Sequence, residues 1–162
     1  MDARQTDRKG QLARFRTGYA SLEAVLAEAS DVTLDRRPAD GGWTAREVVH
    51  HLADMEVHAY IRLRRLLVED RPVLHVPDEP AYARKLQYDR PISASLAVVR
   101  AVRQSSLEIL EGLTPEEWSR AGTHPKIGDY DIGRWLQIYS EHPHDHADQM
   151  RAAMGLPPLV PR

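Results

Sequence analysis

The chain has 162 residues, of which 42% are hydrophobic and 28% are charged, a composition typical of one globular domain with its own core. Its formal net charge of -2 argues against general affinity for the nucleic-acid backbone. It has no cysteine, which excludes disulfides, thiolate metal ligands and a cysteine nucleophile, so any thiol in its chemistry must come from a small molecule.

The chain begins with a charged segment that lacks the apolar run of a signal peptide, and no stretch is long enough for a transmembrane helix. We therefore expect a cytoplasmic protein with no membrane partner. Apolar residues recur at steps of three and four from about Gln5 to Ala29, which predicts a first amphipathic helix. The segment Asp31 to Gly42 contains a proline and a Gly-Gly pair and is predicted to be a loop.

A second helix is predicted to begin at Thr44, which has capping-box spacing with Glu47, and to end near Glu69. Four prolines then forbid a continuous helix between residues 70 and 93, although a short helical turn around Tyr82 to Leu86 fits the pattern. A connection of this length usually forms a crossover or a functional loop. It would let the third long helix lie parallel to the second.

The third long helix is predicted to start with Ser93 as its cap and to end near Gly112. A capped short helix should follow over Thr114 to Trp118, and then a loop over Gly122 to Gly128. The fourth long helix should run from about Asp131 to Met154. No strand-like alternation is evident. The sequence therefore predicts an all-α four-helix bundle, a single domain over residues 1–162, with a long crossover between the second and third long helices.

The placement of the histidines is the most informative feature for function. His142 and His146 are four residues apart, so on a helix they lie on one face and could hold one metal ion, whereas His144 points about 200° away. A third ligand should come from another helix. On the second helix His51 lies on the flank of the apolar stripe with His58 one heptad further, while the neighbouring His50 is predicted to point away. A histidine pair at this spacing also occurs by chance on many helices.

Two segments resemble the DinB-like family of damage-inducible, metal-dependent hydrolase-like bundles. The segment GGWTAREVVHHLADMEVHAY resembles the second helix of that family, and HPKIGDYDIGRWLQIYSEHPHDHADQM resembles its last helix, with a His-x-x-x-His pair and a glutamine three residues further. The middle stretch DEPAYARKLQYDR, the arginine-bearing helix that follows it and the later LTPEEWSR are also similar. The resemblance covers residues from roughly 10 to 157. It implies an up-down-down-up bundle, in agreement with the crossover.

The resemblance also implies one divalent metal ion, commonly zinc or nickel, bound by three histidines with water in the open positions. The positions that match the ligands are His51, His142 and His146, and Gln149 holds the glutamine position. Glu56 matches an acidic residue of the family motif. Three imidazoles also suit copper or iron, so the identity of the metal stays open.

One departure from the family pattern is Pro143, which directly follows the first ligand of the last helix. Within a helix a proline removes one backbone hydrogen bond and crowds the carbonyl four residues earlier, here that of Tyr139, so a kink is expected. A kink could re-aim His142 or make His144 a competing ligand. The pair spaced by four remains the preferred one.

Three histidines with open positions fit a catalytic site better than a structural one. The first functional hypothesis is a metal-dependent transferase or hydrolase that acts on a small-molecule substrate by activating water or a low-molecular-weight thiol. The alternative is a non-enzymatic metal-binding stress-response protein. Glu56, His58 and Tyr60 are weaker candidates for the pocket lining, and for Glu56 and Tyr60 we favour a solvated carboxylate and ordinary packing. Metal should be lost as the pH falls below about 6.5, where free imidazole takes up a proton.

Partners are suggested only weakly by the sequence. Bundles of this kind often pair, so a homodimer is possible. The arginines near the end of the second helix suit the helix macrodipole and are better explained as a solvated helix end than as a DNA-binding patch; they are Arg62, Arg64, Arg65 and Arg71. No nucleic-acid partner is therefore expected.

Overall fold

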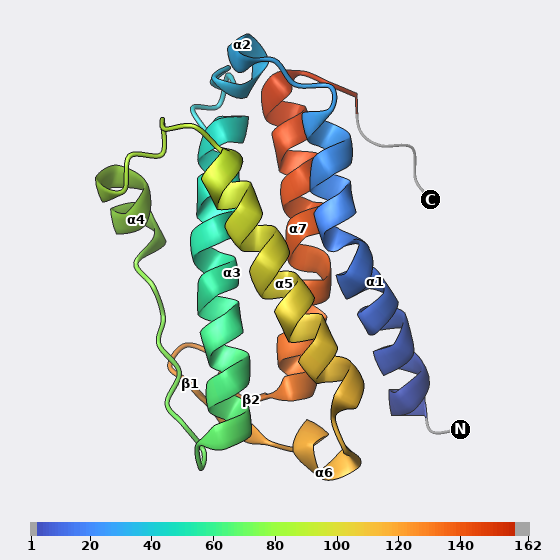
Figure 1. Cartoon of the computed structure of the whole chain (residues 1–162). Helices are drawn as coiled ribbons and strands as arrows, with labels where there is room; N and C mark the ends of the chain where they lie inside the picture. Colours follow the sequence, from blue (N-terminus) through green and yellow to red (C-terminus); the bar gives the residue numbers. More distant parts are fainter. Residues whose placement is uncertain (1–2, 158–162) are drawn as a thin grey trace.

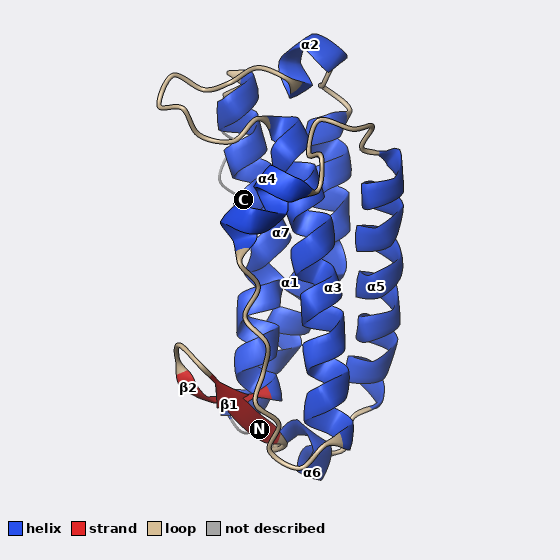
Figure 2. Ribbon diagram, turned by 90° about the vertical axis from the view of Figure 1, so that its left-hand side faces the viewer, coloured by secondary structure: helices blue, strands red, loops and turns tan. Residues whose placement is uncertain are grey.

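The computed structural model describes residues 3–157, and its architecture is a bundle of four long helices (Figures 1 and 2). Figure 1 shows α1 and α7 running in one direction and α3 and α5 in the other, so the topology is up-down-down-up. The all-α bundle with a crossover between the second and third long helices is thereby confirmed. The long helices are α1 (Ala3–Leu26), α3 (Ala45–Val68), α5 (Ser93–Gly112) and α7 (Ile132–Met154). None of the helices in this described part of the chain is long and apolar enough to cross a bilayer.

The helix ends follow local sequence signals. Thr44 caps α3 with its side chain on the backbone N–H of Glu47, and the Glu47 carboxylate accepts in return from the Thr44 N–H. Asp131 caps α7, and Gly155 ends that helix with a φ of 75°, in the left-handed region that glycine adopts without strain. These ends were predicted from the sequence within a residue or two.

Four shorter elements connect the long helices. They are α2 (Asp31–Leu34), α4 (Glu79–Lys85), α6 (Pro115–Trp118) and the antiparallel hairpin of β1 (Ala121–His124) and β2 (Gly128–Asp131). Two of them correct the sequence prediction. The 31–42 segment is not all loop, because Ser30 and Thr33 cap each other around the single turn of α2. The 122–128 segment is not a simple loop, because it lies within the hairpin, whose four-residue strands are too short to show a clear alternation.

The start of α5 also differs from the expectation. Ser93 is the first residue of the helix, and the cap position is Ile92, which makes no side-chain hydrogen bond. Instead, this end of α5 is tied to α3 through Ser95, whose hydroxyl lies 2.8 Å from Nδ1 of His50. A tertiary contact therefore ties this end of α5 to α3, where the sequence predicted a local cap.

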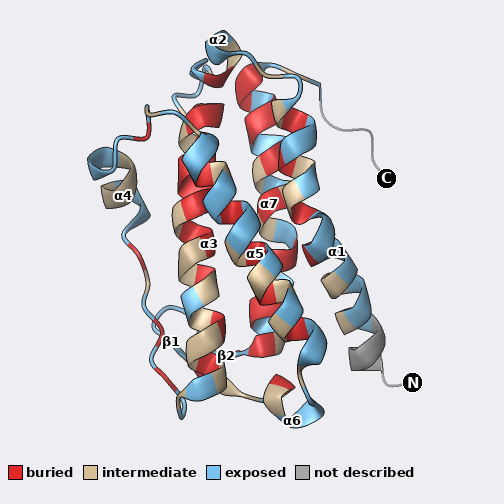
Figure 3. Ribbon diagram, in the orientation of Figure 1, coloured by how far each residue is buried: buried red, intermediate tan, exposed pale blue. Residues whose placement is uncertain are grey.

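The crossover between α3 and α5 passes along the outer side of α3 (Figure 1). Its first part is held by backbone hydrogen bonds to β1, between Leu74 N–H and the Thr123 carbonyl and between Thr123 N–H and the Pro72 carbonyl. Its last part is held by the Tyr88 hydroxyl, which donates to the Asp54 carboxylate at 2.6 Å. The α4 turn between these two anchors contains no buried residue (Figure 3).

The buried residues lie mainly along the four long helices (Figure 3), and the apolar ones form two clusters. The hairpin-side cluster includes Phe15, Leu63, Leu66, Leu110, Trp135 and Leu136. The α2-side cluster includes Leu22, Val25, Val48, Leu52, Val99 and Met150. In sequence, every long helix passes from one cluster to the other near its middle. At that level lie the polar residues that we call the polar layer, namely His51, Glu56, Arg103, His142 and His146.

Candidate metal centre

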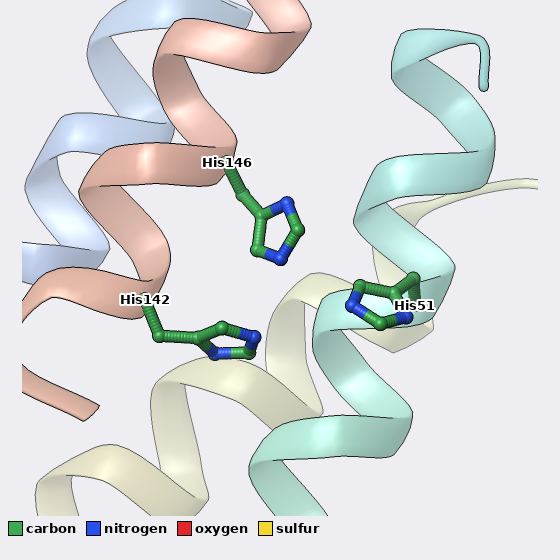
Figure 4. Close-up of side chains that lie close together, drawn as sticks. All are labelled: His51, His142 and His146. Atoms are coloured by element: carbon green, nitrogen blue, oxygen red, sulfur yellow. The ribbon is translucent and has the colours of Figure 1, made fainter. Parts of the chain in front are cut away.

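Three histidines from two helices converge in the polar layer. His51 comes from α3, and His142 and His146 come from α7 (Figure 4). One ring nitrogen of each lies within 4.8 Å of those of the other two. The ring centroids are 4.7 Å apart for the pair on α7, and 6.0 and 4.9 Å from His51 to His142 and His146. The structure therefore brings together the three side chains that the sequence predicted as a set.

The α7 pair owes its geometry to an unbroken helix. The helix continues through Pro143, so His142 and His146 stay one turn apart on the same face, and the kink considered from the sequence does not separate them. His144 lies on another face, and its Nε2 is 3.1 Å from the carbonyl oxygen of Arg14 in α1. It therefore does not compete for the position between His51 and the α7 pair.

Hydrogen bonds at Nδ1 leave Nε2 free on both histidines of α7. Nδ1 of His142 lies 3.2 Å from a carboxylate oxygen of Glu56, and Nδ1 of His146 lies 2.7 Å from Oε1 of Gln149. An ionised carboxylate and an amide oxygen can only accept, so each Nδ1 must carry the proton. The lone pair of each ring is then on Nε2. Metal-binding histidines in proteins are commonly oriented in this way by a second hydrogen bond.

His51 is held differently. It is only 4% exposed, and the ring of Trp43 packs edge-on against it at a centroid distance of 4.7 Å. Its Nδ1 is buried and has no hydrogen-bond partner among the residues that the structure describes. Packing therefore fixes this ring, whereas hydrogen bonds fix the two rings on α7.

Burial keeps two of the three imidazoles neutral. It lowers the pKa of His51 to about 3, with further lowering by the neighbouring His146 and His142. Burial likewise lowers the pKa of His146 to about 4, and His142 adds to this effect. A neutral imidazole offers a lone pair, so near neutral pH both side chains are in the form that can bind a metal ion.

Glu56 corrects a prediction, because it is not a solvated carboxylate. It is 2% exposed and pairs with Arg103 of α5, also buried, at 2.8 Å. Burial by itself would raise the pKa of Glu56, but the charge of Arg103 and the hydrogen bond from His142 lower it, so the carboxylate stays ionised. Arg103 was not among the site residues predicted from the sequence, because a single arginine within a helix looks like any solvated basic residue.

Other candidates from the sequence have structural partners. His50 is fully buried and does not point out of the bundle; its Nε2–H donates to the carbonyl of Arg90 at 2.9 Å. His58 lies 3.0 Å from the Tyr82 hydroxyl and stacks on His75 of the crossover, so it contacts the crossover rather than the triad. Tyr60 packs beneath the guanidinium of Arg64.

The four arginines near the end of α3 also make internal contacts. Arg62 donates to the hydroxyl of Tyr139, and Arg64 donates to Ser105. Arg65 pairs with Glu69, and Arg71 pairs with Asp129 of the hairpin. Each of these four guanidinium groups therefore has a partner within the fold.

The donor set fits a divalent metal ion. Within the described residues, the triad supplies three nitrogen donors, and no fourth histidine, aspartate or glutamate joins the group. Structural zinc sites usually close with four protein ligands, whereas catalytic sites keep a position open. The three donors can therefore hold a metal ion without filling every one of its coordination positions.

Comparison with known proteins gives the context for this site. The family model for the DinB superfamily matches residues 14–150. A protein of Oceanobacillus iheyensis named "Putative metal-dependent hydrolase OB0782" is 35% identical over 125 residues, which cover 77% of this chain and 73% of the relative. YfiT of Bacillus subtilis is 33% identical over 129 residues, covering 78% and 72% of the two chains.

Solved structures share the fold. The structure of Bacillus subtilis YfiT, described as "a probable metal-dependent hydrolase with an unusual four-helix bundle topology", superposes with a TM-score of 0.84 at 28% identity and covers 97% of this chain and 91% of the other. A mycothiol-dependent maleylpyruvate isomerase shares the fold alone, with a TM-score of 0.66 at 16% identity over 91% of this chain and 62% of the other. With a family model that spans most of its length and a relative above 30% identity, the chain belongs to the DinB superfamily.

Proposed function

We propose that this protein is a metal-dependent enzyme that binds one divalent ion through His51, His142 and His146 and uses it to activate a nucleophile, water or a small-molecule thiol. The observation that carries the proposal is the convergence of three ring nitrogens within 4.8 Å, with no fourth histidine, aspartate or glutamate from residues 3–157 beside them. A bound divalent ion lowers the pKa of a coordinated water or thiol, which makes a nucleophile available near neutral pH. Zinc and nickel are the ions to test first.

The residues of the chain set up this chemistry before any ion binds. The depressed pKa values of His51 and His146 keep their lone pairs available, so little work is needed to remove protons at pH 7. Glu56 and Gln149 each accept from an Nδ1–H and thereby orient the α7 imidazoles. Trp43 covers His51 and excludes water from one side of it.

The choice between water and thiol is the open part of the proposal. Hydrolysis fits the names of the relatives at 33 to 35% identity. The thiol route is supported by the fold shared with a protein whose name includes mycothiol dependence. The absence of cysteine from the chain is compatible with this route, since the thiol would then come from a small molecule. In both cases the nucleophile takes the position that the three histidines leave open.

The first test is the metal content of the untagged protein, measured by elemental analysis after reloading with Zn²⁺ or Ni²⁺. We expect about one ion per chain, and loss of that ion in the single variants H51A, H142A and H146A. H144A is the matched control, because His144 lies on the same helix between the two ligands but contacts the Arg14 carbonyl. The proposal fails if no ion is bound, or if H144A loses the ion while H142A keeps it.

Turnover separates an enzyme from a protein that only binds metal. The loaded protein would be screened against ester and amide substrates in water, and against electrophiles mixed with low-molecular-weight thiols. An enzyme should turn over at least one of these, and H142A should abolish the reaction. Stoichiometric metal without turnover in any mixture would favour the alternative, a non-enzymatic metal-binding protein.

A further inference from the structure

Resting on the proposed metal site, we infer that Glu56 and Arg103 are positioning residues for one ligand, His142. Glu56 fixes the proton of His142 on Nδ1, so that Nε2 faces the other two histidines, and Arg103 holds Glu56 in the place where it can do so. Neither residue belongs to the triad. Their effect on the metal is exerted through the orientation and the electron density of the His142 ring.

The first observation is that one carboxylate oxygen of Glu56 accepts hydrogen bonds from both Arg103 and His142. Oε1 of Glu56 accepts from Nη1 of Arg103 at 2.8 Å and from Nδ1 of His142 at 3.2 Å. The side chains of Glu56 and Arg103 are 2% and 4% exposed, so no bulk water competes for that oxygen. A carboxylate behind a metal-binding imidazole fixes its tautomer and raises its basicity as a ligand.

The second observation explains how Arg103 reaches its position. Pro143 has no N–H, so the Tyr139 carbonyl, four residues earlier, lacks its usual helical partner. Nη1 of Arg103 lies 3.2 Å from that carbonyl oxygen and takes over the role of donor. Pro143 therefore leaves a free acceptor, the Tyr139 carbonyl, about one turn from His142. This acceptor holds Arg103 in place.

The third observation is that Arg103 connects all four long helices. From α5 it donates to Glu56 on α3, to the Tyr139 carbonyl on α7 and, through Nη2 at 2.8 Å, to the Phe15 carbonyl on α1. Gly18 gives it the room, because a Cβ at that position would lie 2.7 Å from Nη2 of Arg103 and 2.7 Å from Cγ of Pro143. With three anchors the guanidinium has little freedom, and the Glu56 carboxylate is fixed with it.

Stability alone is a weak reason for such a pair. Taking two charges out of water costs so much that a buried ion pair can often be replaced by apolar side chains with little loss of stability. The bundle has apolar clusters on both sides of this level, so an apolar pair would continue the core. We therefore assign a functional role to the buried ion pair. His142 is the neighbouring side chain that donates a hydrogen bond to its carboxylate.

The test compares the wild type with E56Q and with the double variant E56L/R103L, which leaves no unpaired buried charge. Metal affinity would be measured by competition of Zn²⁺ and Co²⁺ with a chromophoric chelator. The tautomer of His142 would be read in the metal-free protein from the ¹⁵N shifts of its ring. We expect each variant to bind about 10- to 100-fold more weakly. In the double variant, the His142 ring should shift from a single Nδ1–H tautomer to a mixture.

L110A is the control for a purely structural role. Leu110 is buried on α5 in the hairpin-side cluster and is not part of the polar layer. L110A should therefore lower the melting temperature but leave the metal affinity and the His142 tautomer as in the wild type. Wild-type affinity and tautomer in a folded E56L/R103L protein would overturn the inference. If that variant does not fold, the metal affinity and the His142 tautomer of E56Q are compared with those of L110A, under conditions that give the two proteins the same melting temperature. Wild-type values in E56Q would then overturn the inference.

The outcomes also separate this inference from the proposed function. A wild-type protein that binds no metal contradicts the proposed function, yet the ¹⁵N shifts of the metal-free protein still show whether Glu56 fixes the His142 tautomer. Tight metal binding in the wild type and in both variants contradicts only the role of Glu56 and Arg103.

Discussion

The polar layer and the two apolar clusters that flank it do different work in the same bundle. In the clusters, side chains such as Leu63 and Leu52 are fully buried against other apolar groups, and their burial stabilises the fold. In the polar layer, Glu56, Arg103 and His51 are nearly as deeply buried, although desolvation of such groups costs free energy. Burial of the apolar clusters therefore stabilises the bundle. That stabilisation offsets the desolvation cost of the polar residues that form the site.

The largest expected effect on stability comes from the hairpin-side cluster. Leu63→Ala removes a fully buried side chain of α3 and should lower the free energy of unfolding by about 2–5 kcal/mol, because of lost apolar burial and the cavity left behind. Metal affinity should remain that of the wild type, since Leu63 belongs to the hairpin-side cluster and not to the polar layer. Urea unfolding and a chelator competition measure the two quantities. A large loss of metal affinity in L63A would show that the two regions are not separate.

The next effect is a pH dependence of the free energy of unfolding, which comes from His51 of the polar layer. In the unfolded chain His51 takes up a proton near pH 6.5, but in the folded protein its pKa is about 3. Below pH 6.5 the unfolded state therefore binds more protons, and the free energy of unfolding falls with the pH. Between pH 6.5 and pH 4 this amounts to roughly 3 kcal/mol from His51 alone, at 1.36 kcal/mol per pH unit.

The measurement uses the metal-free protein, unfolded by urea across this pH range, with H51N as the comparison. H51N should show a flatter pH dependence, and equal slopes in the two proteins would contradict the assigned pKa. The same shift sharpens the expectation for the loaded protein. Because His51 and His146 stay neutral well below pH 6.5, loss of metal is expected nearer pH 4 than at the value of a free imidazole.

The two regions also differ in how well the sequence predicted them. The apolar clusters follow from helical periodicity, and the caps at Thr44 and Asp131 and the stop at Gly155 follow from local signals. The pair on α7 follows from its spacing of four residues. Such features depend on residues close together in the chain, where the helix geometry is fixed.

The features that sequence reasoning missed depend on contacts between helices. Glu56 looks like a solvated helix carboxylate until Arg103, 47 residues away, is placed beside it. His50 finds its partners only in Arg90 and Ser95 at the far end of the crossover. One local signal did exist, because Pro143 leaves the Tyr139 carbonyl without its helical donor, and that vacancy predicts a donor from elsewhere.

A smaller effect tests the exposed edge of the polar layer. Gln149→Ala removes the acceptor for Nδ1 of His146, at 2.7 Å, but Gln149 is neutral and exposed, so the ring keeps water as a substitute. We expect metal binding to weaken about tenfold, at the low end of the range for such supporting residues, with little change in stability. Q137A is the control, because Gln137 lies on the same helix but accepts from Arg134. Equal affinities for Q149A and Q137A would remove Gln149 from the site.

The smallest expected effect contrasts two glycines of α1, one beside the polar layer and one away from it. A Cβ added at Gly10 would meet nothing within 4 Å, so G10A should raise the free energy of unfolding by up to about 1 kcal/mol through the better helix propensity of alanine. At Gly18 the same methyl group would lie 2.7 Å from both Arg103 and Pro143. The gain in propensity should therefore be cancelled or reversed.

The informative result is the sign of the difference between G10A and G18A in unfolding free energy. The two substitutions are chemically identical and lie in the same helix, so only their surroundings differ. If Arg103 must leave its anchors to admit the new methyl group, G18A should also weaken metal binding, while G10A should not. Urea unfolding and chelator competition on the two variants measure both effects. A stabilised G18A protein with wild-type metal affinity would mean that Arg103 and Pro143 can move to admit the methyl group. Arg103 would then be less tightly held than its three contacts indicate.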